Sequence, residues 1–257
     1  MRKTIIAGNW KMYKTVNEAI TLANGLKRAF YSLDNQDIDI VICPPFTVLS
    51  EVYEVIADSD IQLGAQDVHW EAEGAFTGEV SCLMLKDIGC KFVIIGHSER
   101  RQYFGETNES VNKKIKAALK HELNPIACVG ETLSERERGQ TFKVLDEHIQ
   151  NGLVDINEQD ILKIIVAYEP VWAIGTGKTA TAQQAQEAQK YIRDLLKKMY
   201  NKDIANNIRI QYGGSVKPQN ISELLSQPDV DGALVGGASL EIVSFSEIVT
   251  NAAGVKK

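Results

Sequence analysis

Four polar side chains of different chemical kinds each follow a run of apolar, strand-like residues. Asn9 and Lys11 come after the first such run, His97 after the fourth, and Glu169 after the sixth. A carboxylate can remove a proton from carbon, while an imidazole and an ammonium can hold the oxygen of the enolate that forms. If the strands bring these side chains together, the set indicates proton abstraction next to a carbonyl group.

The elements that must position these side chains are eight strand-like runs, which alternate with segments of helical period. The runs start near Thr4, Ile38, Ile61, Phe92, Asn124, Lys163, Ile208 and Gly232. Divided among eight units, the 257 residues leave about 32 each, and a typical (β/α)8 barrel has roughly 250 residues. We therefore predict an α/β fold, a single (β/α)8 barrel domain over residues 1–257 whose active site lies at the C-terminal ends of the strands.

Two of the helical segments are well marked by their sequence. The first spans Thr107–Leu119 and carries apolar residues on one stripe. The second, Thr181–Tyr200, opens with the capping-box pattern Thr181-x-x-Gln184, in which two residues satisfy each other's backbone N–H groups. Both patterns predict amphipathic helices that pack on the barrel.

Two glycine pairs indicate what the reacting molecule carries. Gly213-Gly214-Ser215 follows the seventh run, and Gly236-Gly237-Ala238 follows the eighth. In barrels the loops after strands seven and eight frequently form a phosphate site, where backbone N–H groups face the anion. We therefore expect the substrate to contain a phosphate group.

The segment after Glu169 has the composition of a loop that closes over a ligand. Pro170 stiffens its start, Gly175 and Gly177 lie near its end, and the residues between them are mostly apolar. A closed loop of this kind would exclude water from the site. A nucleotide-binding P-loop is not predicted, because Trp172 stands where the first glycine of that motif is required.

Composition limits the other functions of the chain. Hydrophobic residues make up 44% of it, yet no apolar run approaches the roughly 18 residues that a membrane helix needs. A formal net charge of -6 without a basic cluster argues against nucleic acid and anionic membranes as partners. The four cysteines show neither a C-x-x-C pair nor a zinc spacing with the histidines, so we expect reduced, buried thiols, no metal and a cytoplasmic location.

With these motifs in place, the chain resembles the triosephosphate isomerase family over its full length. The motifs that carry the resemblance are Gly8–Met12, Gly74–Glu79, Ile95–Arg101, Cys128–Glu131, Ala167–Gly177, Tyr212–Val216 and Gly236–Leu240. The resemblance implies a TIM barrel that interconverts dihydroxyacetone phosphate and D-glyceraldehyde 3-phosphate through an enediolate, a reaction of glycolysis and gluconeogenesis. It also implies that the reaction needs no cofactor and no metal.

The resemblance further implies a role for each residue that follows a strand. Glu169 matches the catalytic base of the family and His97 its electrophile. Lys11 matches the positive charge near the substrate, and Asn9 matches a polar support. Glu99 is expected to anchor Lys11.

The phosphate group is expected to rest on residues of several loops. These residues are Asn9, Lys11 and the N–H groups of Gly175, Ser215, Gly236 and Gly237. Tyr212 and Ser215, placed after the seventh run, are candidates for the groups that hold the loop after Glu169 in its closed position.

A stretch after the third run, Gln66–Glu79, carries aromatic residues outside any periodic element. It contains His69, Trp70 and Phe76, and aromatic side chains are enriched in the cores of protein interfaces. We expect this segment to be a docking arm. The resemblance implies a homodimer in which Thr77 reaches towards the active site of the other chain.

Two other functions would be compatible with part of this set of glycine pairs and polar residues. Another phosphosugar-binding barrel enzyme would keep the glycine pairs but would not need the four polar residues together. A non-catalytic phosphate-binding barrel would be expected to have lost Glu169 or His97. The chain retains all four residues, and its departures from the common family pattern, Tyr13 and Asp67 in place of Asn, touch no catalytic position. An isomerase is therefore the favoured function.

Overall fold

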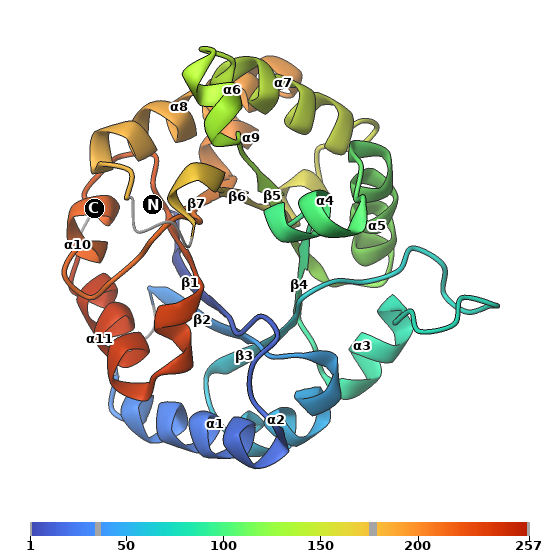
Figure 1. The fold of residues 1–257 in the computed structure, drawn as a ribbon, viewed down its shortest axis with the longest axis vertical. Helices are drawn as coiled ribbons and strands as arrows, with labels where there is room; N and C mark the ends of the chain where they lie inside the picture. Colours follow the sequence, from blue (N-terminus) through green and yellow to red (C-terminus); the bar gives the residue numbers. More distant parts are fainter. Residues whose placement is uncertain (1, 34–36, 175–178, 256–257) are drawn as a thin grey trace.

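The computed structural model describes residues 2–33, 37–174 and 179–255. Within them, parallel strands close into a barrel in chain order, and helices surround it (Figure 1). The strands are β1 (Thr4–Asn9), β2 (Ile38–Cys43), β3 (Ile61–Ala65), β4 (Phe92–Ile95), β5 (Asn124–Val129), β6 (Ile165–Tyr168), β7 (Arg209–Tyr212) and β8 (Gly232–Val235). This arrangement confirms the predicted (β/α)8 barrel.

Helices follow the strands on the outside of the barrel. Those of the described residues are α1 (Val16–Phe30), α2 (Leu49–Ile56), α3 (Cys82–Ile88), α4 (Ser98–Phe104), α5 (Asn108–Lys120), α6 (Leu133–Glu137), α7 (Thr141–Gly152), α8 (Ala182–Met199), α9 (Lys202–Asn207), α10 (Ile221–Leu225) and α11 (Ile242–Ala253). The two helices predicted from their patterns are α5 and α8. At the start of α8 the Thr181 hydroxyl accepts the N–H of Gln184, and the Gln184 side chain accepts the N–H of Thr181, which confirms the capping box.

The predicted strand starts agree with the structure except at β6 and β7. β6 starts at Ile165, because Lys163 still belongs to a short 3-10 turn. β7 starts at Arg209, because Ile208 is the residue that terminates α9. In both places the apolar run continues into the preceding turn, so hydrophobicity alone does not mark the boundary of the strand.

The core has two parts, because successive side chains of each strand point to opposite faces of the sheet. Side chains that point into the barrel form one apolar cluster, Ile5, Ala7, Val41, Cys43, Phe92, Ile94, Ile126, Cys128, Ile165, Ala167 and Leu234. Side chains at the alternate positions pack against the helices. Near the N-terminal ends of the strands, the Asp39 carboxylate binds Lys3 at 2.8 Å and Arg209 at 2.5 Å. The interior of the barrel is thus filled, and it supports a site at the C-terminal ends of the strands, where the polar residues lie.

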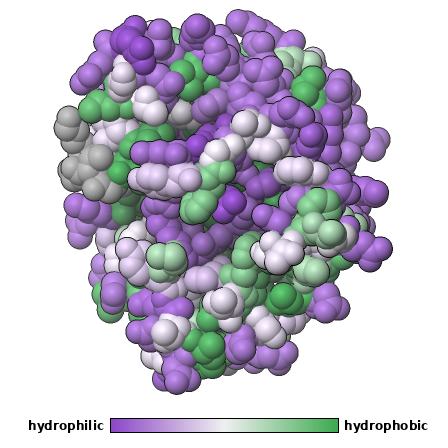
Figure 2. Space-filling model, turned by 45° about the vertical axis from the view of Figure 1, so that its right-hand side comes forward, coloured by the Kyte–Doolittle hydropathy of each residue, from purple (hydrophilic) through white to green (hydrophobic). Residues whose placement is uncertain are grey.

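The predicted docking arm leaves the barrel between β3 and α3 and extends away from it (Figure 1). The His69 ring stacks on Trp70 with 4.3 Å between ring centroids, and it lies 4.4 Å from the ring of Phe76. Phe76 nevertheless remains 43% exposed. Figure 2 turns this side of the molecule forward and shows apolar side chains among hydrophilic ones. The arm is therefore stiffened by its own aromatic cluster and still presents apolar surface.

All four cysteines are buried and free, as predicted: Cys43, Cys82, Cys90 and Cys128. No helix among the described residues has the length and apolarity needed to cross a membrane. In the same part of the chain, no three His, Cys, Asp or Glu side chains are grouped so that they could hold a metal ion.

Candidate active site

A cavity of about 290 Å³ lies at the carboxyl ends of the barrel strands. Its wall contains the four residues predicted to do chemistry and most of those predicted to bind phosphate: Asn9, Lys11, His97, Glu169, Ser215, Gly236 and Gly237. Gly175, the remaining predicted phosphate ligand, lies outside the described residues. Residues that are far apart in the sequence therefore share one site, because parallel strands of a barrel end on the same face.

Glu169 is buried in the wall of this cavity, 2% exposed, and both of its carboxylate oxygens are held. Oε1 lies 2.9 Å from Nε2 of His97, and Oε2 accepts the backbone N–H of Ser98 at 2.9 Å. A Cβ at position 213 would lie 2.8 Å from Cγ of Glu169, so only glycine lets the neighbouring strand end approach this closely. Burial raises the pKa of Glu169, but the imidazole of His97 and these hydrogen bonds outweigh it and lower the pKa. The carboxylate is therefore ionised at neutral pH, as a base must be.

His97 presents Nε2 to the cavity because its other nitrogen is already occupied. The backbone N–H of Glu99 donates to Nδ1 at 3.2 Å, so the proton of the neutral ring is on Nε2. Burial lowers the pKa of His97, but the carboxylate of Glu169 outweighs it and raises the pKa. A ligand that separates these two groups leaves burial as the main influence and favours the neutral ring. Neutral His97 can then donate a hydrogen bond to a substrate oxygen.

Lys11 is held in a backbone conformation that side chains rarely adopt. Its φ is 52°, and its N–H donates to Oδ1 of Asn9 at 2.9 Å. Its carbonyl accepts a hydrogen bond from Nε2 of Gln66 at 2.8 Å, a contact that the sequence did not indicate. Its ammonium lies 2.5 Å from Oε1 of Glu99. The expected anchoring of Lys11 by Glu99 is thus present, and Asn9 supports the strained backbone of Lys11.

The predicted supporting residues lie around the cavity and not in its wall, with the exception of Ser215. Tyr212 is fully buried. Burial raises the pKa of its hydroxyl to about 12, and the backbone N–H of Ala180, which faces the hydroxyl, acts in the opposite direction. Thr77 is exposed on the docking arm and does not contribute to the cavity of its own chain.

A buried charged network supports the backbone that carries His97, and the sequence analysis did not identify it. Oε2 of Glu106 accepts the N–H of Gly96 at 3.0 Å, and Oε1 binds the Lys114 ammonium. Lys114 also lies 2.7 Å from the carboxylate of Asp67. The one signal in the sequence is that Lys114 falls on the apolar stripe of α5, where a charge must find a buried partner.

Comparison with known proteins identifies the family to which this site belongs. The model of the triosephosphate isomerase family matches residues 4–252. The chain belongs to the triosephosphate isomerase family. It is 58% identical over 250 residues to the triosephosphate isomerase of Carboxydothermus hydrogenoformans, across 97% of this chain and 98% of that protein. It is 55% identical over 249 residues to the triosephosphate isomerases of Endomicrobium trichonymphae and Thermoanaerobacter pseudethanolicus, across 97% of this chain and 98% and 99% of those proteins.

Membership of the triosephosphate isomerase family confirms the predicted enzyme class. It also confirms the predicted reaction, the interconversion of dihydroxyacetone phosphate and D-glyceraldehyde 3-phosphate in glycolysis. The alternatives of a different phosphosugar enzyme and of a non-catalytic barrel have no support from these matches.

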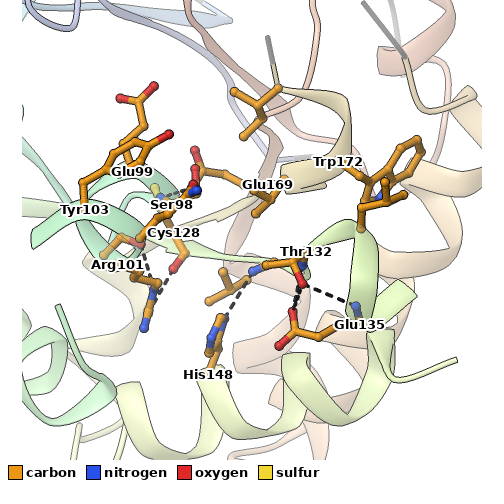
Figure 3. Close-up of a pocket in the computed structure, with 17 residues that line it drawn as sticks. Ser98, Glu99, Arg101, Tyr103, Cys128, Thr132, Glu135, His148, Glu169 and Trp172 are labelled. Carbon is orange, nitrogen blue, oxygen red and sulfur yellow. Dashed lines mark hydrogen bonds between the residues drawn. The ribbon is translucent and has the colours of Figure 1, made fainter. Parts of the chain in front are cut away.

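A second cavity of about 650 Å³ lies on the other side of Glu169, between the segments after β4, β5 and β6 (Figure 3). Its wall includes His148, whose Nδ1 accepts the N–H of Gly130 at 3.3 Å. Burial is the main reason why the pKa of His148 is lowered to about 4. The same wall includes Trp172, which donates to a Glu131 oxygen at 2.9 Å at the start of the predicted closing loop. Residues 175–178 of that loop lie outside the described residues.

Proposed function

We propose that Glu169, His97, Lys11 and Asn9 carry out the triose phosphate isomerisation in the cavity of about 290 Å³. The observation that carries the proposal is the contact between Glu169 and His97, 2.9 Å apart, in a cavity that also contains both glycine pairs. The contact places an ionised base next to a hydrogen-bond donor. A substrate bound here would present its carbon to Glu169 and its carbonyl oxygen to His97.

The first step is a proton transfer from carbon to Glu169. The carboxylate removes a proton from the carbon next to the carbonyl group, and the electron pair of the broken C–H bond moves to form the enediolate. The Nε2–H of His97 and the ammonium of Lys11 stabilise the negative charge on the oxygen. A second proton moves from the hydroxyl of the carbon that was deprotonated to the oxygen of the former carbonyl, by way of Nε2 of His97. Protonated Glu169 then returns its proton to the adjacent carbon, which gives the isomeric product and restores the carboxylate.

Binding of the substrate changes the contacts of Glu169. In the structure Oε1 of Glu169 is in contact with Nε2 of His97. The carbonyl oxygen of the substrate therefore has to replace Oε1 at Nε2 before the reaction begins. Glu169 is then free to turn towards the carbon, while His97 keeps its orientation because the N–H of Glu99 still holds Nδ1.

The phosphate group is proposed to bind between the two glycine pairs. Gly236 supports this placement, because a Cβ at this position would lie 3.5 Å from Cε of Lys11, which puts the backbone of this loop next to the lysine. Ser215 and Gly237 complete the described part of the phosphate site. Gly175 is proposed as a further N–H donor on the basis of the resemblance.

The proposed assembly is a homodimer formed through the docking arm. Large apolar side chains are exposed in the loops after β1, β2 and β3: Met12, Tyr13, Phe46 and Phe76. A second copy of this chain would cover them, and Thr77 would then reach the active site of the partner. We also propose a cytoplasmic location, which agrees with four free thiols.

A coupled assay with Glu169→Gln tests the assignment of the base. The amide has nearly the same shape but cannot accept the proton, so kcat should fall by at least about 10²- to 10⁴-fold. Circular dichroism should show an intact fold. Near-wild-type kcat in this variant would remove Glu169 from the mechanism.

A further inference from the structure

The charges around the active site do not by themselves favour a phosphate group. Phosphate esters carry close to two negative charges at neutral pH, since their second pKa is about 6. Lys11 is paired with Glu99 at 2.5 Å, and Glu169 adds a negative charge to the cavity wall. A further positive charge on the side where the phosphate group binds would therefore add to the attraction that the backbone N–H groups provide.

Lys217 lies in the wall of the same cavity, two residues after Ser215. Among the side chains that the structure describes, none forms an ion pair with Lys217. Its neighbour Val216 is buried, whereas Lys217 is exposed. The residue thus offers an uncompensated ammonium on a flexible four-carbon stem next to the proposed phosphate site.

The backbone that carries Lys217 is fixed on both sides. Oδ1 of Asn220 accepts the N–H of Lys217 at 2.8 Å, and Nδ2 of Asn220 donates to the carbonyl of Ser215 at 3.1 Å. From α11, Nδ2 of Asn251 donates to the carbonyl of Pro218 at 2.9 Å. The same side chain, Asn220, therefore ties Lys217 to a proposed phosphate ligand, so the base of the lysine keeps a constant position relative to the phosphate site.

We propose that Lys217 is a phosphate-binding and specificity-determining residue of this enzyme, which attracts the dianion of the substrate to the N–H groups between the glycine pairs. The proposal rests on the proposed placement of the phosphate group. Lys217 acts on the phosphate group and not on the reacting carbons, which the proposed mechanism places against Glu169 and His97. Its contribution belongs to substrate capture and leaves the chemical step to Glu169 and His97.

The size of the effect follows from the exposure of the side chain. Because the ammonium is in contact with solvent, its attraction for the phosphate group is moderate and is screened by salt. Removing it should lower kcat/KM by about 3- to 10-fold at low ionic strength, with the change mainly in KM. The difference between wild type and variant should shrink as salt is added.

The test compares Lys217→Gln with wild type over a range of ionic strengths at constant pH. D-Glyceraldehyde 3-phosphate and the unphosphorylated D-glyceraldehyde are the two substrates, and glycerol 3-phosphate is the competitive probe. Lys198→Gln is the matched control, because it removes an exposed lysine at the end of α8, which does not line the cavity. Lys217→Arg tests whether any cation at this position suffices.

We expect Lys217→Gln to lower kcat/KM for the phosphorylated substrate, to weaken inhibition by glycerol 3-phosphate and to reduce the salt dependence of both. Turnover of D-glyceraldehyde should not change, Lys217→Arg should recover most of the loss, and Lys198→Gln should match wild type. An unchanged kcat/KM with an unchanged salt dependence would overturn the proposal, and so would an equal loss with both substrates. A wild-type protein that is inactive on triose phosphates would instead contradict the proposed function.

Discussion

Two histidines next to Glu169 show how the immediate surroundings of a residue set its proton affinity. His97 and His148 are both largely buried, and burial lowers the pKa of each. At His97 a carboxylate 2.9 Å away reverses the effect and raises the pKa. At His148, for which the described residues provide no carboxylate within ion-pair distance, burial dominates and the pKa falls to about 4. The same kind of side chain therefore serves as a hydrogen-bond donor in one cavity and as a neutral acceptor in the other.

The lowered pKa of His148 predicts a specific loss of stability in acid. Its pKa in the folded protein, about 4, is below the value of about 6.5 in an unfolded chain. The stability that it contributes is therefore present above pH 6.5 and is lost as the pH falls towards 4. Between pH 6.5 and 4.5 this loss should amount to about 2 kcal/mol.

Urea denaturation of wild type and His148→Gln at both pH values measures this contribution. Glutamine can still accept the N–H of Gly130, so the variant should fold and should lose about 2 kcal/mol less between the two pH values. His121→Gln is the matched control, since His121 lines neither cavity. Equal pH dependence in wild type and His148→Gln would show that His148 is not the group responsible.

At the scale of elements, the loop between β6 and α8 is connected to the barrel at both described ends. At its start the Trp172 side chain donates to Glu131, and at its end the N–H of Ala180 faces the hydroxyl of Tyr212 on β7. An enediolate with a phosphate group on the adjacent carbon can expel that phosphate if the phosphate is free to rotate. A loop that holds the phosphate group and excludes water therefore protects the intermediate.

Tyr212→Phe should weaken this protection without unfolding the barrel. Removing the hydroxyl that the N–H of Ala180 faces should cost about 1 kcal/mol, which predicts a fall in kcat of about fivefold, together with more methylglyoxal and inorganic phosphate among the products. Tyr200→Phe is the control, because it removes a hydroxyl that donates to the carbonyl of Ile156 away from the site. A slower Tyr212→Phe enzyme that releases no additional phosphate would mean that Tyr212 supports substrate binding only.

At the scale of the whole molecule, the exposed apolar residues around the docking arm determine the expected assembly. Sedimentation equilibrium at micromolar concentration should show a dimer, since the role proposed for Thr77 is in the site of a partner. Thr77→Lys would place a charge in the proposed interface and should lower both the dimer fraction and the activity. Tyr31→Lys makes the same change of charge at a side chain that is 92% exposed at the end of α1, and it should have no effect. A fully active wild-type monomer would contradict the proposed dimer.

The order of the elements and the polar residues that follow them are encoded locally, and these features could be predicted. Periods of two and 3.6 residues mark strands and helices, and a parallel barrel places the strand ends on one face whatever the details of packing. For this reason the sequence alone assigns Asn9, Lys11, His97 and Glu169 to one site. The predicted start of β6 is earlier than the observed one, because the apolar Ile164 that ends the preceding turn continues the pattern of the strand.

The contacts between these residues were decided by the tertiary structure alone. The left-handed backbone of Lys11, the hydrogen bond that places the proton of His97 on Nε2, and the support of Gly96 by Glu106 all depend on the positions of neighbouring elements. Asp39 and Arg209 meet because closure of the barrel brings β7 within reach of β2, from which β8 and β1 separate it in the sheet. Local sequence patterns specify which way a side chain points from its own strand. Which partner it meets depends on the closure and register of all eight strands, and these are set by the packing of the whole chain.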